Sequence, residues 1–269
     1  MDEGLRVTGK SRVIFLIGTP VAQTESPGLF NRHFAQTGID RVVTPLDLKP
    51  PHLGAFFAMV RDAENCDGVI LTVPHKQATL PLVDEVSERA RALGSVNVVR
   101  RNADGGLAGD MTDGPGFWAG ARAHGFDPAG KRVVIAGAGA AATAIAHEFA
   151  VQGGGHLTIV NRNADETERL MQKLAGHGLR LDAGMPESLS AYYMAINATP
   201  LGMAYAPGTP FDRALLATLP AGAFVADAVT EPVETLLLGD ARALKLNALP
   251  GAAMTRGQFE MLGHALGVL

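Results

Sequence analysis

The sequence predicts an α/β fold with two domains, and three observations support this prediction. Short runs rich in valine and isoleucine alternate with longer alanine-rich stretches of helical spacing, as in parallel strands joined by crossover helices. A strand, a glycine turn and a helix follow one another from residue 131. Just before them, residues 109–130 have the composition of one helix that ends in a turn of glycine, proline and aspartate. We therefore place a domain boundary near residue 113.

Each expected strand is an apolar run bounded by turn or polar residues. Before the boundary, RVIFLIG and RVVTPLDL are rich in β-branched residues, DGVILTV stops at a proline, which cannot donate to a sheet, and VNVVRR follows. After it, KRVVIAGAG runs into glycines, HLTIVNR ends in polar residues, and MAINATP and AFVADAV complete the set. The eight ranges are 12–18, 41–48, 67–73, 96–101, 131–139, 156–162, 194–200 and 223–229.

The composition favours a small-molecule ligand. Lysine and arginine total 23 against 27 acidic residues, which gives a net charge of −4 with no basic block, so neither nucleic acid nor an anionic membrane is an expected partner. A single cysteine, Cys66, excludes an internal disulfide framework and any multi-cysteine metal site. The eight histidines are scattered and predict no metal site. With a polar N-terminus and no long apolar run, these features predict a cytoplasmic protein.

The stretch VVIAGAGAAATAIAHEFA, residues 133–150, predicts a dinucleotide site. Gly137, Ala138 and Gly139 would let the backbone approach a pyrophosphate that faces the helix N-terminus, with Ala142 at the third position of the motif. The alternative is a tight turn with no ligand. About 20 residues later, Asn161 and Arg162 stand where an acidic residue would hold a ribose hydroxyl.

Arg162 offers a guanidinium to a 2′-phosphate, which favours NADP over NAD. Asp165, Glu166 and Glu168 oppose this, although acidic residues also stabilise the first turn of a helix.

The stretch LTVPHKQ, residues 71–77, predicts chemistry at a strand end. Thr72 would end a strand, Pro74 would stop the sheet ladder, and Lys76 would begin a helix. Open α/β sheets keep their ligands at strand ends, although a solvated lysine is the simpler alternative. Asp113 lies at the expected domain boundary in GDMTDG. A lysine beside an aspartate in a cleft can pass a proton to or from a carbinol while a cofactor moves the hydride.

These residues belong to a series of motifs, and together the series resembles the shikimate dehydrogenase family, which includes quinate/shikimate dehydrogenases. The resemblance runs almost end to end and keeps the family's order. Its motifs are GTPVAQTESPGLFN, LTVPHKQ, LGSVNVV, GDMTDG, GAGAAA, NRN, NATPLGM and PGAAMTRGQFE.

The resemblance implies a role for each matching residue. Lys76 would be the catalytic acid/base and Asp113 its orienting partner, while Thr24 and Ser26 would hold the substrate carboxylate instead of capping a helix. The implied substrate-binding residues are Thr24, Ser26, Thr72, Lys76, Asn97, Asp113, Thr230 and Gln258. The implied cofactor-binding residues are Gly137, Ala138, Gly139, Ala140, Ala141, Asn161, Arg162, Asn163, Thr199, Met203, Ala228, Gly251 and Met254.

Five positions depart from the family's usual residues, and we expect them to face ligands. Thr24 replaces serine, Leu71 and Met111 replace asparagines, Thr230 replaces a tyrosine that reaches the substrate, and Glu166 replaces an arginine. Loss of the tyrosine would enlarge the pocket and remove one hydrogen bond. The free energy of substrate binding would change by about 1 to 3 kcal/mol if a polar group is left unpaired. The departures leave the ring substrate and the choice of cofactor open.

The implied architecture is a substrate-binding catalytic domain of residues 1–112, completed by a helical return over 236–269, and a Rossmann domain of residues 113–235, with the substrate in the cleft between them. The implied activity is interconversion of shikimate, or a related cyclic acid such as quinate, and its 3-dehydro ketone with NADP or NAD, by a monomer or homodimer. Two alternatives stay open. One is another two-domain dehydrogenase, such as a methylenetetrahydrofolate dehydrogenase, although none of the three tyrosines precedes Lys76. The other is a ligand-sensing relative without catalysis.

Overall fold

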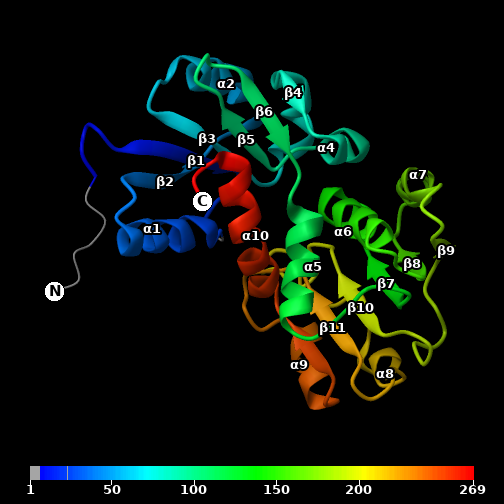
Figure 1. Cartoon of the computed structure of the whole chain (residues 1–269). Helices are drawn as coiled ribbons and strands as arrows, with labels where there is room; N and C mark the ends of the chain where they lie inside the picture. The colour runs from blue at the N-terminus through cyan, green and yellow to red at the C-terminus, as the bar shows by residue number, and fades with distance from the viewer. Residues whose placement is uncertain (1–6, 23) are drawn as a thin grey trace. The chain divides into compact units, whose positions relative to one another are not determined.

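The computed structural model describes residues 7–22 and 24–269, and the chain divides into two compact units. Unit 1 contains the chain up to Thr112 together with Gln258–Leu269, and unit 2 is Asp113–Gly257. Each unit is built on one six-stranded sheet with helices, so the predicted α/β class is confirmed (Figure 1). Unit 2 extends beyond the expected end at residue 235, because its last strand pairs with the sheet of that unit.

The sheet of unit 1 has the strand order β2-β1-β3-β5-β6-β4. The pairs β1/β2, β1/β3 and β4/β6 are parallel, whereas β5 runs antiparallel to both β3 and β6. The elements are β1 (Arg12–Gly18), α1 (Ser26–Thr37), β2 (Arg41–Asp47), η1 (Pro50–His52), α2 (Leu53–Asp62), β3 (Cys66–Leu71), α3 (His75–Ala78), η2 (Leu80–Leu82), β4 (Glu85–Val86), α4 (Glu88–Leu93), β5 (Val98–Arg101) and β6 (Leu107–Asp110).

The expectation of parallel strands is wrong for β5 in unit 1, and the cause is local. Strands β5 and β6 are joined by a tight turn in which Asn102 N–H donates to the Gly106 carbonyl and Gly105 has a φ of 86°. A hairpin of this length forces the two strands to run antiparallel.

Helices α1 and α2 cover opposite faces of this sheet (Figure 1). Helix α1 buries Phe30 and Phe34, which are four residues apart and therefore share one helix face. The C-terminal helix α10 (Gly251–Leu266) contributes Leu262 and Leu266 to the same apolar cluster. Its Phe259 ring lies 4.7 Å from the ring of Phe30, centre to centre. The last part of the chain thus contributes to the core of unit 1.

Unit 2 has a fully parallel sheet in the order β12-β11-β10-β7-β8-β9. Numbered by appearance within the unit, this order is 3-2-1-4-5-6 read from β9, the order of a dinucleotide-binding Rossmann fold. The elements are α5 (Asp113–Ala123), β7 (Arg132–Ala136), α6 (Ala140–Val151), β8 (His156–Val160), α7 (Ala164–Leu174), β9 (Arg180–Ala183), β10 (Met194–Asn197), α8 (Arg213–Leu216), β11 (Phe224–Asp227), α9 (Leu236–Ala243) and β12 (Asn247–Leu249).

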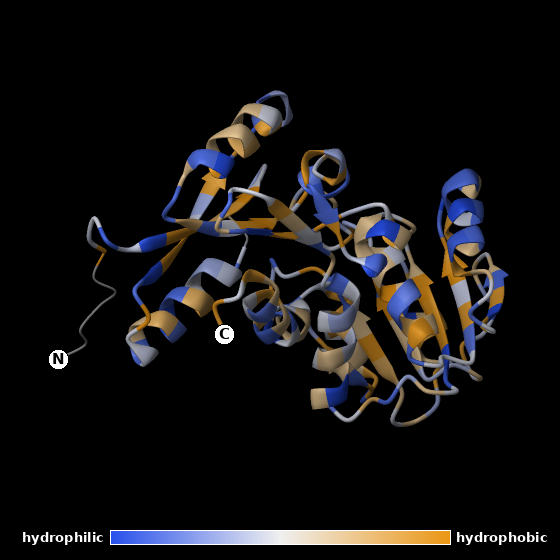
Figure 2. Ribbon diagram, turned by 45° about the horizontal axis from the view of Figure 1, so that its top comes forward, coloured by the Kyte–Doolittle hydropathy of each residue, from blue (hydrophilic) through white to orange (hydrophobic). Residues whose placement is uncertain are grey.

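Successive residues of the central strands of unit 2 belong to two different cores. Val133 and Ile135 pack with residues of α5, α6 and α7, whereas Val134 and Ala136 pack with residues of α8 and α9. A strand covered on both faces reads as a continuous apolar run, which is why the sequence showed these strands clearly. In Figure 2 the same strands are hydrophobic along their length.

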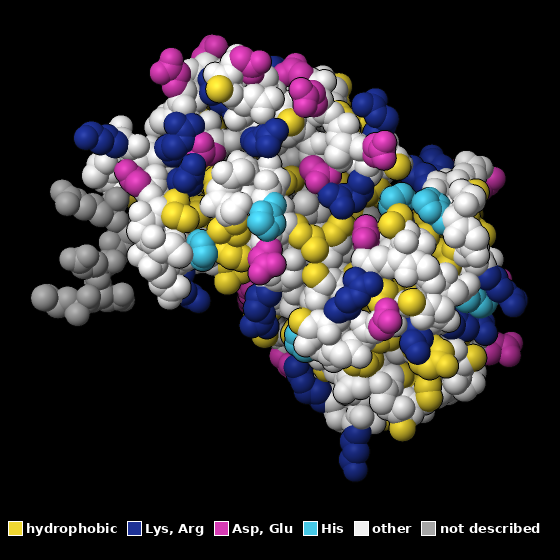
Figure 3. Space-filling view, in the orientation of Figure 1, with side chains coloured by type: hydrophobic (Ala, Val, Ile, Leu, Met, Phe, Trp, Pro, Cys, Tyr) yellow, Lys and Arg dark blue, Asp and Glu magenta, His cyan; other side chains and the backbone are white. Residues whose placement is uncertain are grey.

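In the described part of the chain, no helix combines the length and the apolar character needed to cross a bilayer. On the face seen in Figure 3, basic and acidic side chains are interspersed rather than separated into patches.

Helices α5 and α10 approach each other closely within unit 2 because the contact is made by glycines. A Cβ atom at Gly257 would lie 2.2 Å from the Gly116 carbonyl oxygen and 2.7 Å from the Gly120 nitrogen. A Cβ atom at Gly120 would lie 2.4 Å from the Ala253 carbonyl oxygen. Backbone atoms cannot rotate away as a side chain can, so these positions have no room for a larger residue.

We predict that Gly257→Ala lowers the free energy of unfolding by about 1 to 3 kcal/mol, because the new methyl group collides with backbone. Gly54→Ala is the matched control in α2, since nothing lies within 4 Å of its added Cβ. It should be neutral or stabilise the protein by about 0.5 to 1 kcal/mol through helix propensity. Urea unfolding of both variants checks this, and an equally stable Gly257→Ala protein would contradict the packing.

Candidate active site

The candidate substrate residues of unit 1 follow two neighbouring strands. Strands β1 and β3 are parallel neighbours in the sheet. The chain that leaves β1 continues to β2 on one side, whereas the chain that leaves β3 continues to β4 on the other side. This divergence opens the carboxyl edge of a sheet and is where α/β folds bind ligands. The segment after β1 carries Thr24 and Ser26, and the segment after β3 carries Thr72 and Lys76. The sheet therefore brings both sets of predicted residues to one edge.

Thr72 is fixed against the end of β1. Its N–H donates to the Ile17 carbonyl at 2.9 Å, and the Thr19 N–H donates to the Val73 carbonyl at 3.0 Å. A Cβ atom at Gly18 would lie 2.3 Å from the Thr72 Cγ2 atom. Glycine at the end of β1 is thus what allows Thr72 to lie there.

Lys76 lies in the short helix α3, which follows Pro74 as expected. The Lys76 carbonyl accepts a hydrogen bond from Val96 N–H at 2.9 Å, so its backbone is fixed to the segment that precedes β5. His75 is fully buried, and its Nε2 donates to the Leu48 carbonyl at 2.7 Å. His75 therefore anchors α3 to the end of β2 instead of facing a ligand, while the Lys76 side chain is half-buried.

Asn97 joins two segments that the sequence separates by 15 residues. Its side-chain oxygen accepts from Thr112 N–H at 2.8 Å, and its Nδ2 donates to the Thr112 hydroxyl at 3.0 Å. Its backbone carbonyl accepts from Leu71 N–H at 2.7 Å. Thr112 directly precedes Asp113, which begins α5 and is 1% exposed. This pairing could not be found from the sequence, because only the paired strands β5 and β6 bring the two residues together.

Thr24 and Ser26 do not cap α1. The N-cap residue is Glu25 and it makes no side-chain capping bond, so the alternative role for these hydroxyls is excluded. The Thr24 hydroxyl donates to the Val21 carbonyl at 2.7 Å and keeps its acceptor lone pairs for another group. The Ser26 hydroxyl, half-buried at the start of α1, makes no hydrogen bond to any described residue. Both hydroxyls can therefore bind a ligand.

Gln258 is positioned by its neighbour in α10. Phe259 packs on Phe30, and the His33 ring lies 5.2 Å from the Phe259 ring. These contacts hold this turn of α10 against α1, the helix that begins with Ser26. Gln258 itself is half-buried.

The end of β6 is fixed by a charged cluster that sequence reasoning did not find. Asp110 accepts hydrogen bonds from the Ser87 hydroxyl at 2.5 Å and from Arg89 Nη2 at 2.6 Å, and also from Met111 N–H at 2.7 Å. Burial acts to raise the pKa of Asp110, but the bonds from Arg89 and Ser87 outweigh it, and the pKa is lowered overall. The ionised carboxylate thus stabilises the strand that leads to Thr112.

Two expected ligand-facing departures are enclosed. Leu71 is 2% exposed and Met111 is 0% exposed, so both pack inside the protein in this structure. An asparagine at either position would have to bury an amide, whereas leucine and methionine fill the space with apolar atoms. The expectation that all five departures face ligands is therefore wrong for these two.

The predicted glycine turn of unit 2 lies between β7 and α6. Gly137 has a φ of 110°, which favours glycine, and its added Cβ would lie 2.8 Å from the Ala198 carbonyl oxygen. Gly139 is the N-cap residue of α6 and offers no side chain to the amides of the first turn, which Ala140 and Ala141 begin. Strands β7 and β10 are the neighbours at which the strand order reverses, so the turn has the geometry of a phosphate-binding site.

The segment after β8 combines basic and acidic groups. Asn163 caps α7, since its side-chain oxygen accepts from the N–H groups of Asp165 and Glu166. Asn161 Nδ2 donates to the Glu166 carboxylate at 3.1 Å. The Arg162 side chain is exposed and forms no ion pair or hydrogen bond with the described residues. Arg162 is therefore free to bind a phosphate, while the carboxylate of Glu166, in the first turn of α7, is held by Asn161.

The remaining predicted cofactor residues gather at the ends of β10 and β11. The Thr199 hydroxyl donates to Asn197 Oδ1 at 2.7 Å, and Ala228 N–H donates to the Asn197 carbonyl at 2.9 Å. A Cβ atom at Gly251 would lie 2.3 Å from the Val229 carbonyl oxygen, so the start of α10 lies on the backbone beside Thr230.

Two predicted residues are methionines. Met203 is half-buried in the loop after β10, and Met254 packs against the core of unit 2. Met254 thus fills space in the core.

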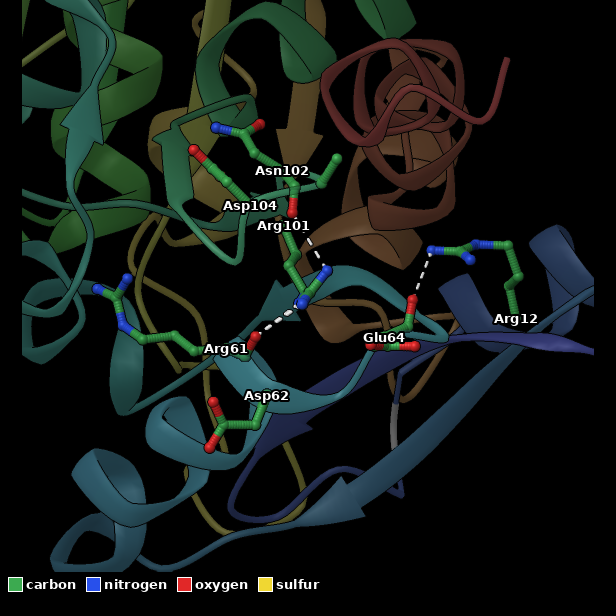
Figure 4. A pocket seen from close by; sticks show the side chains of 8 residues that line it. Arg12, Arg61, Asp62, Glu64, Arg101, Asn102 and Asp104 are labelled. Atoms are coloured by element: carbon green, nitrogen blue, oxygen red, sulfur yellow. Dashed lines mark hydrogen bonds between the residues drawn. The ribbon is translucent and has the colours of Figure 1, made fainter.

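A cavity of about 700 Å³ lies at the opposite, amino-terminal edge of the unit 1 sheet (Figure 4). Its arginines already have partners: Arg12 pairs with Asp67, Arg61 with Asp84, and Arg101 donates to the Arg61 carbonyl. None of the predicted site residues lines it. The cavity is therefore a gap between structural ion pairs, distinct from the candidate site.

Comparison with known proteins identifies two matching family models. Residues 16–99 match the model described as the shikimate dehydrogenase substrate binding domain, and residues 121–200 match the model described as shikimate / quinate 5-dehydrogenase. The shikimate dehydrogenase (NADP(+)) of Rubrobacter xylanophilus is 37% identical over 254 residues, covering 93% of this chain and 88% of that protein.

Two solved structures are similar to this chain over almost its full length. Shikimate 5-dehydrogenase from Listeria monocytogenes, in complex with shikimate and NAD, is 29% identical with a TM-score of 0.85, covering 98% of this chain and 93% of that one. The ligand-free 5-ketofructose reductase of Gluconobacter sp. strain CHM43 is 32% identical with a TM-score of 0.85, covering 96% and 93%.

The Asp110 cluster generates a pH prediction. Because its pKa is lowered in the folded protein, its contribution is present above the unfolded value of about 3.9 and is lost as the pH falls through the folded value. Asp110→Asn should therefore reduce the free energy of unfolding by about 1 to 3 kcal/mol at pH 7 and by less at about pH 3, below the unfolded pKa. Urea unfolding at the two pH values measures this. Asp62→Asn, at an exposed carboxylate with no hydrogen bond to the described residues, should change little at either pH. Equal losses for Asp110→Asn at both pH values would refute the charge assignment.

Proposed function

The chain belongs to the shikimate dehydrogenase family, and from this premise we propose that it interconverts shikimate, or a related cyclic polyhydroxy acid such as quinate, and its 3-dehydro ketone. The single observation that carries the proposal is the gathering of Thr24, Ser26, Thr72 and Lys76 at the diverging ends of β1 and β3. Hydroxyls that can take a carboxylate thus lie at the same sheet edge as an amine that can exchange a proton.

In this proposal, each predicted substrate-binding or catalytic residue has a distinct task. The hydroxyls of Thr24 and Ser26 bind the substrate carboxylate, and the polar groups of Thr72, Asn97 and Gln258 bind its ring hydroxyls. Lys76 takes up the hydroxyl proton during oxidation and returns it during reduction. Asp113 is the second catalytic group, and the Asn97–Thr112 pair supports its position through the chain. Membership of the family and this set of residues argue against a non-catalytic sensor and against a folate dehydrogenase.

Unit 2 fits a nicotinamide dinucleotide, which when bound would accept or supply the hydride. Support comes from the cradle at Gly137, whose Cβ position is already filled by backbone, and from the uncapped amides of α6. Thr199, Met203, Ala228 and Gly251 would line the nicotinamide half, with Thr230 near it.

The side chain of Arg162 favours NADP as the cofactor, with NAD as the weaker one. Asn163 would contribute through its position in the turn, because its side chain already caps α7.

A second candidate is reduction of a sugar-derived ketone that carries no carboxylate. The 32% identity to a 5-ketofructose reductase favours it. So does Thr230, which is smaller than the tyrosine usual in the family and would leave room for a different substrate. We further propose that the protein works in the cytoplasm as a monomer or homodimer and binds neither nucleic acid nor membrane.

Lys76→Ala tests the proposed activity directly. We expect kcat for shikimate oxidation to fall by about 10² to 10⁴, because general acid–base catalysis is worth that much. The dissociation constant of NADP⁺ should change by no more than about twofold, which corresponds to about 0.4 kcal/mol of binding free energy. Lys10→Ala is the control, at an exposed lysine before β1. An active Lys76→Ala enzyme would remove Lys76 from the mechanism.

Arg162→Ala tests the choice of cofactor. Loss of the guanidinium should raise KM for NADP⁺ about tenfold, which corresponds to about 1.4 kcal/mol, and leave KM for NAD⁺ nearly unchanged. Glu166→Gln removes the opposing charge but keeps an acceptor for Asn161, and it should lower KM for NADP⁺. Initial rates at saturating shikimate provide both constants. A proportional change for the two cofactors would contradict the role given to Arg162.

A further inference from the structure

Asp227, the last residue of β11, is a buried carboxylate that the proposed mechanism does not use. It is 1% exposed, and no cation pairs with it in residues 7–22 and 24–269. Three donors face it instead. Asn197 Nδ2 lies 2.9 Å and Val229 N–H 3.0 Å from its Oδ1, and the Thr235 hydroxyl donates to Oδ2 at 2.7 Å. Burial raises the pKa of Asp227, which shows that enclosing this charge costs free energy.

The partner Asn197 is fully used. Its side-chain oxygen accepts from Thr199 N–H at 3.0 Å and from the Thr199 hydroxyl at 2.7 Å. Its Nδ2 donates to the Leu201 carbonyl at 2.7 Å and to Asp227. An amide has two donor hydrogens and two acceptor lone pairs, so all four are satisfied and the orientation of the side chain is fixed. Asp227 supplies one of the two acceptors that fix it.

The loop held by Asn197, residues 198–203, lies directly on the glycine turn. Ala198 N–H donates to the Ala136 carbonyl at 2.9 Å, and an added Cβ at Gly137 would lie 3.3 Å from Thr199 Cγ2. A shift of the loop by a fraction of an ångström therefore changes the space available at the turn.

Thr235 closes the other side of the loop. It is 2% exposed and caps α9 by accepting from Leu238 N–H. A Cβ atom at Gly202, where φ is 106°, would lie 3.2 Å from Thr235 Cγ2. Asp227 thus connects the loop, the end of β11 and the start of α9 through one carboxylate.

We propose that Asp227 is a positioning residue of the dinucleotide site: through Asn197 and Thr235 it fixes loop 198–203 against the glycine turn, and the affinity for dinucleotide depends on it. The inference rests on the proposed function, because it assigns the loop to the dinucleotide. It concerns a residue that acts through others and does not touch the ligand.

The test compares binding and kinetics in variants of the full chain. Asp227→Ala leaves Asn197 Nδ2 with one acceptor instead of two, so the dissociation constant of NADP⁺, measured by calorimetry, should rise about tenfold. KM for NADP⁺ should rise with it, whereas KM for shikimate should stay within about twofold. Thr235→Val removes one bond to the carboxylate and should weaken NADP⁺ binding less. Thr235→Ser keeps the hydroxyl and should bind NADP⁺ as tightly as the unaltered protein. The two Thr235 variants test the inference even if Asp227→Ala does not fold.

Asp212→Ala is the matched control. Asp212 also caps a helix of unit 2 with its carboxylate, accepting from Leu215 N–H at 2.7 Å, but none of its hydrogen bonds reaches the loop. The Asp212→Ala substitution should lower the thermal stability without changing the dissociation constant of NADP⁺. The inference is overturned if Asp227→Ala and Thr235→Val lower stability in the same way and bind NADP⁺ as the unaltered protein does. Absence of NADP⁺ and NAD⁺ binding in the unaltered protein would instead refute the proposed function, and the inference with it.

Discussion

The functional residues of both units depend on one constraint of parallel sheets: where neighbouring strands send their connections in different directions, the carboxyl edge stays open. In unit 1 this happens between β1 and β3, and in unit 2 between β7 and β10. The segments that follow these four strands carry Thr24, Thr72, the glycine turn and the loop after Asn197. The strand order thus determines where the candidate substrate residues of unit 1 and the glycine turn of unit 2 lie, and the side chains then determine what can bind there.

Glycines allow the segments at these edges to approach one another. At Gly18 a methyl group would collide with Thr72, and at Gly137 it would collide with the backbone of Ala198. Gly18 is the last residue of β1 and Gly137 directly follows β7, and in both places the segment packed against the glycine carries a predicted ligand-binding residue. The polar groups are then oriented by side chains that lie behind them: Asn97 holds Thr112, His75 holds the end of β2, and Asn197 holds Thr199. Such supporting bonds decide how far a functional group can move.

Much of this could be predicted from the sequence, because its signals are local. Apolar runs marked eight of the strands, Pro74 marked the start of α3, and Gly137 with Gly139 marked the turn before α6. Strands β4, β6, β9 and β12 were missed because none of their sequences, EV, LAGD, RLDA and NAL, contains a run of apolar residues. The Asn97–Thr112 and Asn197–Asp227 bonds were equally hidden, because strand pairing alone brings together residues 15 and 30 positions apart. Leu71 and Met111 were taken for ligand-facing residues, and only the burial of their side chains corrects this.

The most direct measurement is the initial rate of the purified protein with shikimate, quinate and 5-ketofructose, each with NADP or NAD in the appropriate oxidation state. Because Thr24 and Ser26 are proposed to bind a carboxylate and Arg162 a 2′-phosphate, we expect the highest kcat/KM for shikimate with NADP⁺. Turnover of 5-ketofructose with NADPH and no turnover of either cyclic acid would contradict the account and favour a substrate without a carboxylate.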